Sequence, residues 1–136
     1  MIDFRDLMLG DFVFCPKLGR ALEVNSTTFN GKIVEFEGIP VTKEILKNIG
    51  FEEYDDLPLE GTFCRYWDKD YKYKIDVRNF WTNSRREWYI HIDNDVCNTI
   101  GSGEFTYVHE LQNLVRINCK ADLPITKEMI YGNTNE

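Results

Sequence analysis

The sequence lacks the patterns that define several large classes of protein. No stretch approaches eighteen apolar residues, so nothing in it predicts a membrane-spanning helix. The first six residues are acidic, and their apolar run is too short for a signal peptide. Gly-rich phosphate loops, Walker patterns and G-x-S-x-G motifs are also missing. The sequence therefore offers no motif for membrane insertion, secretion, nucleotide binding or serine hydrolysis.

Cysteines are few and widely spaced. Cys15, Cys64, Cys97 and Cys119 lie 49, 33 and 22 residues apart, without any C-x-x-C pair. Structural zinc sites and small disulfide frameworks usually need closer pairs. Together with the missing signal sequence, this spacing predicts reduced thiols in a cytoplasmic protein, without a metal site or a cofactor.

The overall charge is acidic but uneven. A net charge of -7 disfavours general binding to nucleic acid or to anionic membranes, because phosphate is repelled at long range. Between Arg65 and Arg86, however, there are seven Lys or Arg and three Asp or Glu, a local net charge of +4. One basic patch on an acidic body is compatible with a protein partner, and nucleic acid is the alternative partner for the patch.

The length of 136 residues suits one domain with its own core, and the composition, 43% hydrophobic and 29% charged, is that of a globular protein. The chain contains no internal repeat and no linker long enough to divide domains. We expect a single domain over residues 1–128 and a flexible tail over residues 129–136.

The clearest periodicity lies between Gly61 and Asp93, which also contains all three tryptophans. Apolar and charged residues alternate with period 2 from position 71 onward, which is typical of strands with one packed face and one wet face. The sequence predicts three antiparallel strands: Gly61–Trp67, Tyr71–Phe80 and Glu87–Asp93.

A four-residue turn at 82–85 would fix the register of the second hairpin. It pairs apolar with apolar residues on one face and opposite charges on the other, and a slip of one residue would destroy both patterns. The predicted pairs are Trp81–Arg86, Asn79–Trp88, Val77–Ile90, Ile75–Ile92, Arg78–Tyr89, Asp76–His91 and Lys74–Asp93.

The N-terminal third predicts a hairpin layer. Strands are expected at Asp11–Cys15 and Ala21–Ser26, and Asn30-Gly31 is a strong turn signal before an antiparallel return at Lys32–Phe36. The run resembles the start of a small SH3-like barrel, a fold with many functions. Which face is buried is left open. An exposed edge here would allow pairing with a second copy, so a homo-oligomer also stays open.

Two helices are predicted. The first is short, with Thr42 as N-cap, Gly50 after its last turn, and an apolar stripe of Ile45, Leu46 and Ile49. After a Gly/Asn-rich connection at 94–104 with a short strand near 97–100, the second runs from Tyr107 to about Asn118 behind a Thr106 cap. Its apolar face is Val108, Leu111, Leu114 and Val115.

The polar face of the final helix is the most enzyme-like cluster. It comprises His109, Gln112, Asn113 and Arg116. His109 could act as a general base beside an anion clamp at Arg116. The structural alternative, which we favour, is that these side chains pin the helix to the sheet, because no nucleophile motif accompanies them.

Two further groups have a functional and a structural interpretation. His91, Asp93 and Asp95 have H-x-D-x-D spacing, but this composition is also that of a turn, which we favour. Cations interleaved with aromatics can grip phosphates and stack bases. The basic-aromatic residues of the central strands are Arg65, Tyr66, Lys72, Lys74, Arg78, Arg85 and Arg86. We favour core aromatics plus a solvated charged face here.

Three segments carry a resemblance: LMLGDFV, IPVTKEILKNIGF and YVHELQNL. They resemble a group of small proteins from Bacteroides-type gut bacteria, their phages and mobile elements. The C-terminal segment is the most specific, and it matches at Tyr107, Val108, His109, Leu111, Gln112 and Asn113. The resemblance implies a single α+β domain in a bacterial or phage setting, and no activity is established for the group.

Together these patterns predict an α+β domain with an N-terminal hairpin layer, a short helix, a central antiparallel meander and a C-terminal helix packed on it. For function we expect a non-enzymatic accessory protein that binds another protein. The alternatives are a nucleic-acid-associated module using residues 65–86, and a small hydrolase or metal enzyme using His91 or His109.

Overall fold

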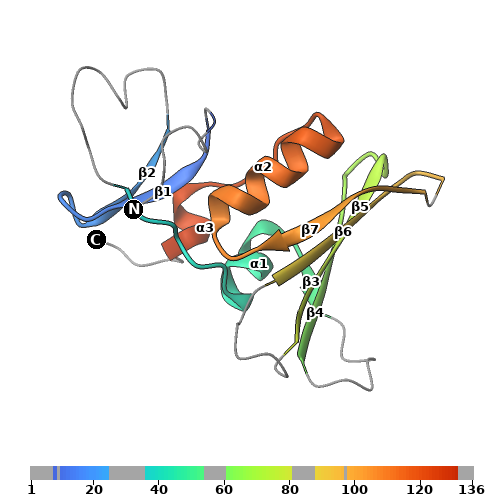
Figure 1. Cartoon of the computed structure of the whole chain (residues 1–136), viewed down its shortest axis with the longest axis horizontal. Coiled ribbons are helices and arrows are strands. Elements are labelled where there is room, and N and C mark those ends of the chain that lie inside the picture. Colours follow the sequence, from blue (N-terminus) through green and yellow to red (C-terminus); the bar gives the residue numbers. More distant parts are fainter. Residues whose placement is uncertain are drawn as a thin grey trace.

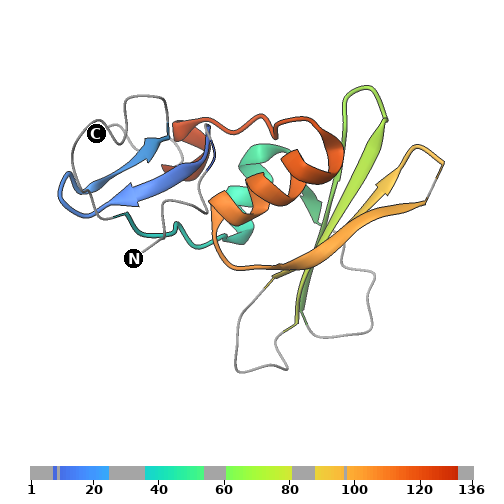
Figure 2. The same ribbon diagram turned by 45° about the horizontal axis from the view of Figure 1, so that its top comes forward.

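The described part of the chain folds into two antiparallel sheets with helices between them (Figure 1). The computed structural model describes residues 8, 10–24, 36–53, 61–80, 88–96 and 98–131. Within these residues, a two-stranded sheet and a five-stranded sheet are separated by α1, α2 and α3, as the turned view in Figure 2 also shows. The predicted α+β class is therefore confirmed.

The five-stranded sheet contains the predicted meander. Its strand order is β3-β4-β5-β6-β7, and all neighbours are antiparallel. The bounds are β3 Glu52–Glu53, β4 Gly61–Trp67, β5 Tyr73–Phe80, β6 Trp88–Asn94 and β7 Thr99–Phe105. Every predicted β5–β6 pair from Asn79–Trp88 to Lys74–Asp93 is confirmed. The pair Trp81–Arg86 lies outside the described residues.

The predicted alternation decides which side of this sheet is buried. Ile75, Val77, Ile90 and Ile92 point to the helices and have no exposed surface. Their neighbours along each strand point to the opposite side, because successive side chains of a strand alternate. The apolar positions of β5 and β6 thus form the floor of the main core.

Strand β7 differs from the prediction. The sequence suggested a Gly/Asn-rich connection with a short strand near 97–100, whereas a seven-residue strand pairs with β6. Its glycines serve close packing instead of turning the chain. A Cβ built on Gly101 would lie 2.4 Å from Cγ of Asn118, and one on Gly103 would lie 3.5 Å from a methyl of Leu114. Glycine therefore allows α2 to pack directly on this strand.

Helix α1, Lys43–Ile49, forms as predicted. The Thr42 hydroxyl accepts a hydrogen bond from the backbone N–H of Ile45 at 3.2 Å, and Gly50 ends the helix with a φ of +123°. Ile45, Leu46 and Ile49 are the buried residues of this helix. The cap, the terminator and the buried stripe are all confirmed.

Helix α2, Val108–Cys119, begins one residue later than the predicted helix. The Glu110 carboxylate accepts hydrogen bonds from the backbone N–H groups of Thr106 and Tyr107 at 3.1 and 3.0 Å. These bonds satisfy donors that a helix start leaves free, so Tyr107 is the N-cap in place of Thr106.

The N-terminal hairpin layer is confirmed and buries both of its faces. It comprises β1 Phe12–Cys15 and β2 Arg20–Glu23. Phe12 and Ala21 join the main core. The opposite face joins a second cluster formed by Val13, Cys15, Val24 and Phe36. After residues 25–35, which lie outside the described residues together with the predicted Asn30-Gly31 turn, Glu37 pairs with Phe14 of β1.

A third helix follows Pro124, where the sequence predicted none. Helix α3, Lys127–Tyr131, starts inside the single domain expected for residues 1–128 and covers the first residues of the expected tail. Met129 and Ile130 pack against the main core, and the Met129 carbonyl accepts a hydrogen bond from the Asn48 side chain at 2.9 Å. Contacts with α1 and β2 hold this short helix in place, and local sequence could not reveal them.

Candidate functional site

Gln112 on α2 holds this helix against the N-terminal hairpin. Its Oε1 accepts a hydrogen bond from the backbone N–H of Phe12 at 2.8 Å, and its Nε2 donates to the carbonyl of Gly10 at 2.9 Å. The side chain is 4% exposed. Gln112 therefore satisfies buried backbone groups of another element, which is a structural role.

Arg116 continues this connection one turn further along α2. It donates hydrogen bonds to carboxylates of Asp11 at 3.0 Å and Asp122 at 2.6 Å, and to the amide oxygen of Asn113 at 3.0 Å. Burial would lower the pKa of Arg116, but the bonds to Asp122 and Asp11 raise it above its usual value. The guanidinium is a fixed charge that ties α2 to the segment preceding β1.

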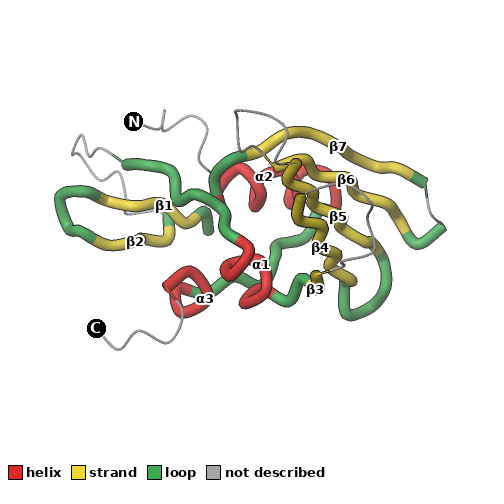
Figure 3. Tube along the Cα trace, turned by 90° about the horizontal axis from the view of Figure 1, so that it is seen from below, coloured by secondary structure: helices red, strands yellow, loops and turns green. Residues whose placement is uncertain are grey.

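His109 lies inside the molecule as well. It is 4% exposed, and its ring stacks on that of Tyr107 at a centroid distance of 5.9 Å and an angle of 8°. The predicted division of α2 into a buried and a polar face was therefore wrong for His109 and Gln112. Helix α2 lies between two sheets, so it is buried on two sides (Figure 3).

The opposite side of the five-stranded sheet is covered by no described helix (Figure 3). We call it the outer sheet face, and it consists of the outward side chains of β3 to β7. These are Glu52, Arg65, Trp67, Lys74, Asp76, Arg78, Tyr89, His91, Asp93, Ser102 and Glu104.

Arg65 and Lys74 on the outer sheet face have carboxylate partners. Arg65 donates a hydrogen bond to Asp76 at 2.7 Å, and the Lys74 ammonium lies 3.4 Å from Asp93 and 3.9 Å from Asp76. Asp76 is only 6% exposed. The described face carries three Lys or Arg and four Asp or Glu, so it is nearly neutral where the sequence suggested a basic patch. Arg85 and Arg86 lie outside the described residues.

Aromatic side chains are exposed on and beside this face. Trp67 is 46% exposed and Tyr89 is 41% exposed. The Arg65 guanidinium carbon lies 5.9 Å from the Trp67 ring centroid and the Lys74 ammonium 5.8 Å from it, both within cation–π range. In the turn that follows β4, Tyr71 is 70% exposed and its ring centroid lies 6.1 Å from that of Trp67.

Tyr66, which the sequence grouped with the cations, points the other way. Its ring lies 5.3 Å from that of Phe51 and 6.5 Å from that of Tyr73, on the helix side of the sheet. Trp67 takes its place beside the cations. Strand parity within β4 could have revealed this, because Trp67 shares a face with Arg65.

The H-x-D-x-D group forms a small hydrogen-bonded cluster. His91 Nε2 lies 2.9 Å from Asp93 Oδ1 and 3.1 Å from the Thr99 hydroxyl, which also donates to Asp93. Asp95 lies in the exposed β6–β7 turn. In the part of the chain that the structure describes, no group of three His, Cys, Asp or Glu residues could hold a metal ion.

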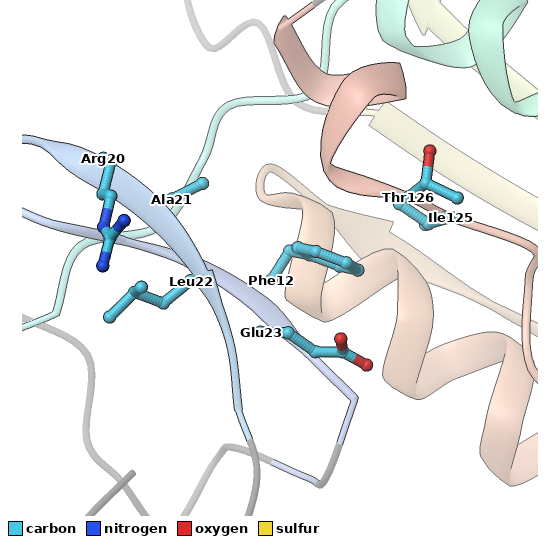
Figure 4. Close-up of a pocket in the computed structure, with 7 residues that line it drawn as sticks. All are labelled: Phe12, Arg20, Ala21, Leu22, Glu23, Ile125 and Thr126. Carbon is cyan, nitrogen blue, oxygen red and sulfur yellow. The ribbon is translucent and has the colours of Figure 1, made fainter. Parts of the chain in front are cut away.

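Two hollows lie elsewhere on the molecule. One of about 360 Å³ separates β2 from the start of α3 (Figure 4). Its lining residues are Phe12, Arg20, Ala21, Leu22, Glu23, Ile125 and Thr126. The other, of about 530 Å³, lies between the β4–β5 turn and the C-terminal end of α2, and Tyr66, Tyr73, Asp68, Cys119 and Asp122 are among its lining residues. Neither hollow was predicted from the sequence.

The described cysteines are poor candidates for nucleophiles. Cys15, Cys64 and Cys119 are free thiols. Burial raises the pKa of Cys64 and of Cys119 to about 11 in each case. Because the thiolate is the reactive form, both side chains are protonated and weakly reactive near neutral pH.

Comparisons of the chain with protein-family models, with curated proteins and with solved structures find no match. Among the described helices, none is long and apolar enough to cross a membrane.

Proposed function

We propose that this chain is a non-enzymatic binding module that recognises a protein partner through the outer sheet face. The observation that carries the proposal is the exposure of Trp67 and Tyr89 on a face whose neighbouring charges are paired within the molecule. Large exposed aromatics beside an Arg are the residue types that dominate the energetics of protein interfaces. The proposed contact centres are therefore Trp67, Tyr89 and Arg78.

The paired charges favour a protein over a polyanion. A phosphate backbone binds through unpaired Lys and Arg, whose counterions it releases. On the outer sheet face, Arg65 and Lys74 already contact Asp76 and Asp93, so phosphate would have to compete with fixed carboxylates. A protein surface can instead cover the aromatic rings together with the Arg65–Asp76 pair that lies between them, because a neutralised pair leaves no unpaired charge and helps to set specificity.

Nucleic acid is the second candidate, and one observation favours it. Arg65 and Lys74 both lie within cation–π range of the Trp67 ring, and such a group could stack a base while cations approach the backbone. This binding would weaken steeply as salt is raised. It would also depend on Arg85 and Arg86, which were predicted as binding residues and lie outside the described residues.

An enzymatic role for the α2 cluster has less support. Gln112 and Arg116 are engaged with Gly10, Phe12, Asp11 and Asp122, and His109 is buried. A general base needs access to a substrate proton, and these positions form the interior seam between α2 and the hairpin. A turnover activity lost on changing His109 in a folded variant would contradict the proposal.

The cellular setting is part of the same proposal. The resemblance of three segments to proteins of Bacteroides-type bacteria and their phages supports a cytoplasmic accessory protein of bacterial or mobile-element origin. Affinity capture from such a bacterial lysate, with and without nuclease, tests the nature of the partner. A specific protein that survives nuclease supports protein recognition, whereas capture that nuclease abolishes would favour the nucleic-acid alternative.

A further inference from the structure

The two edges of the five-stranded sheet are protected very differently. Strand β3 forms one edge with only two residues, Glu52 and Glu53, and a short charged edge resists the addition of another strand. Strand β7 forms the other edge with seven residues, of which only Glu104 is charged. Over the described residues, the backbone of 100–105 makes hydrogen bonds to β6 alone, so no described strand pairs with its outer side.

Helix α2 provides an apolar flank beside this open edge. It runs back over β7, with Asn118 above Gly101 and Leu114 above Gly103. Ile117 follows Leu114 by three residues, so the two share a side of the helix. Ile117 is 62% exposed, although it stands beside Leu114, which is partly buried and packs against the main core. If the added strand belongs to a similar sheet, the helix that covers that strand would pack against Ile117.

We propose that β7 pairs antiparallel with β7 of a second copy, about a two-fold axis at Ser102. This register pairs Ser102 with its own counterpart, Gly101 with Gly103, and Ile100 with Glu104. Two five-stranded sheets would become one continuous sheet, and the Ile117 flanks of the two α2 helices would cover each other. A two-fold interface requires such self-complementarity.

The one charged residue of β7 does not prevent pairing with a second copy of the chain. In this register Glu104 faces Ile100 of the other copy, and the two Glu104 positions are four residues apart along the strands, roughly 13 Å. That separation exceeds the Debye length of about 8 Å at physiological salt, so their repulsion is small. Each copy carries a net charge of -7, which opposes association at long range. The dimer should therefore strengthen as salt is raised, opposite to binding of nucleic acid.

A cysteine at the axis tests the register. Directly opposed residues of antiparallel strands have Cα atoms about 4.5–5.5 Å apart, within the range that a disulfide spans. Mild oxidation of a Ser102→Cys variant should join residue 102 to residue 102, identified by mass spectrometry of the digested dimer. A Glu104→Cys variant is the matched control and should give no 104–104 link. Absence of the 102–102 link, or equal linking by both variants, would overturn the proposal.

Sedimentation of the unmodified chain over a wide concentration range tests the dimer without crosslinking. We expect a reversible monomer–dimer equilibrium that Ile117→Lys weakens by roughly tenfold or more, an effect of about 1.4 kcal/mol. The matched control is Leu18→Lys, because Leu18 is 54% exposed in the β1–β2 turn, away from β7. A monomer at every concentration, or equal weakening by both variants, would refute the pairing. Failure here leaves the outer-face proposal standing, because Trp67 and Tyr89 lie on other strands.

Discussion

Single residues without side chains set the distance between α2 and the five-stranded sheet. At Gly101 an added methyl group would lie 2.4 Å from Asn118, whose amide already donates a hydrogen bond to the Leu114 carbonyl at 2.7 Å. At Gly103 the same methyl group would meet Leu114 at an ordinary contact distance of 3.5 Å. Gly101 and Gly103 lie on the same strand, but only position 103 has room for an added methyl group.

The first prediction compares alanine at these two positions. We expect Gly101→Ala to lower the free energy of unfolding by about 1–3 kcal/mol, because Asn118 or the helix must shift. Gly103→Ala should change it by less than about 1 kcal/mol. Alanine fits at this position, and it lowers the conformational entropy that the unfolded chain loses on folding. Denaturant unfolding of both variants checks this, and equal effects would contradict the packing described for β7.

The second prediction concerns the stability lost when Gln112 is replaced. Replacing Gln112 with Ala leaves the N–H of Phe12 and the carbonyl of Gly10 without the partners that they have now. An unsatisfied buried group costs about 1–3 kcal/mol, so we expect a loss of that order or above in thermal or denaturant unfolding. Leu18→Ala is the control and should cost less than about 0.5 kcal/mol, because Leu18 is largely exposed in the β1–β2 turn. Similar losses for both variants would argue against the role of Gln112.

At the scale of the element, an ion-pair clamp joins α1 to the sheet. Glu53 of β3 lies 2.6 Å from the Lys43 ammonium and 3.2 Å from that of Lys47. The hydrogen bond to Lys43 is the main cause that lowers the pKa of Glu53 below 4.5, with a smaller contribution from Lys47 against the opposing effect of burial. The clamp is partly solvent-exposed, so its contribution to stability is modest.

The third prediction follows from the sign of this shift. A carboxyl group with a depressed folded pKa stabilises the fold above its unfolded pKa, and the stabilisation disappears as pH falls through the folded value. Stability should therefore decline below about pH 4.5, by less than about 1 kcal/mol from this clamp. Glu53→Gln should remove that part of the decline, whereas Glu104→Gln should retain it. Unfolding curves between pH 6 and pH 3 test this, and identical pH profiles for the two variants would contradict the clamp.

The elements also show what could be predicted from the sequence. The β5–β6 register was predictable because a local alternation and a turn length both had to agree, and α1 was predictable because its cap, stripe and terminator are local. Strand β7 and helix α3 were missed because they depend on distant contacts. Glycines at 101 and 103 look like turn residues until α2 lies on them, and α3 is held by α1 and β2.

The same limit applies to the candidate site. Period 2 placed Arg78 and Tyr89 correctly on an outward face. The predicted register also placed Lys74 opposite Asp93, and the structure confirms this pair. It could not show that Asp76 would neutralise Arg65, because no register was predicted between β4 and β5. The polar residues of α2 suggested a functional face, and only the position of the N-terminal hairpin shows that Gln112 and Arg116 are anchors.

At the scale of the whole molecule, the fold divides into an interior seam and an outer surface. Helix α2 is held on one side by the hairpin, through Gln112 and Arg116, and on the other by β7. Gln112 and Arg116, which resemble catalytic residues in the sequence, form hydrogen bonds between α2 and the hairpin segment. Trp67 and Tyr89 lie exposed on the outer sheet face instead, and we propose that this face binds a protein.

The most direct test of that claim compares variants in capture from nuclease-treated lysate. A Trp67→Ala/Tyr89→Ala double variant alters the outer sheet face, and a Leu18→Ala/Val96→Ala double variant is the control, since both control residues are exposed apolar side chains in turns. Unfolding curves first establish that both variants fold. We predict that the captured protein is reduced at least roughly tenfold with the outer-face variant, as loss of two interface hot spots requires, and is retained by the control. Equal capture by both variants would show that the outer sheet face is not the binding surface.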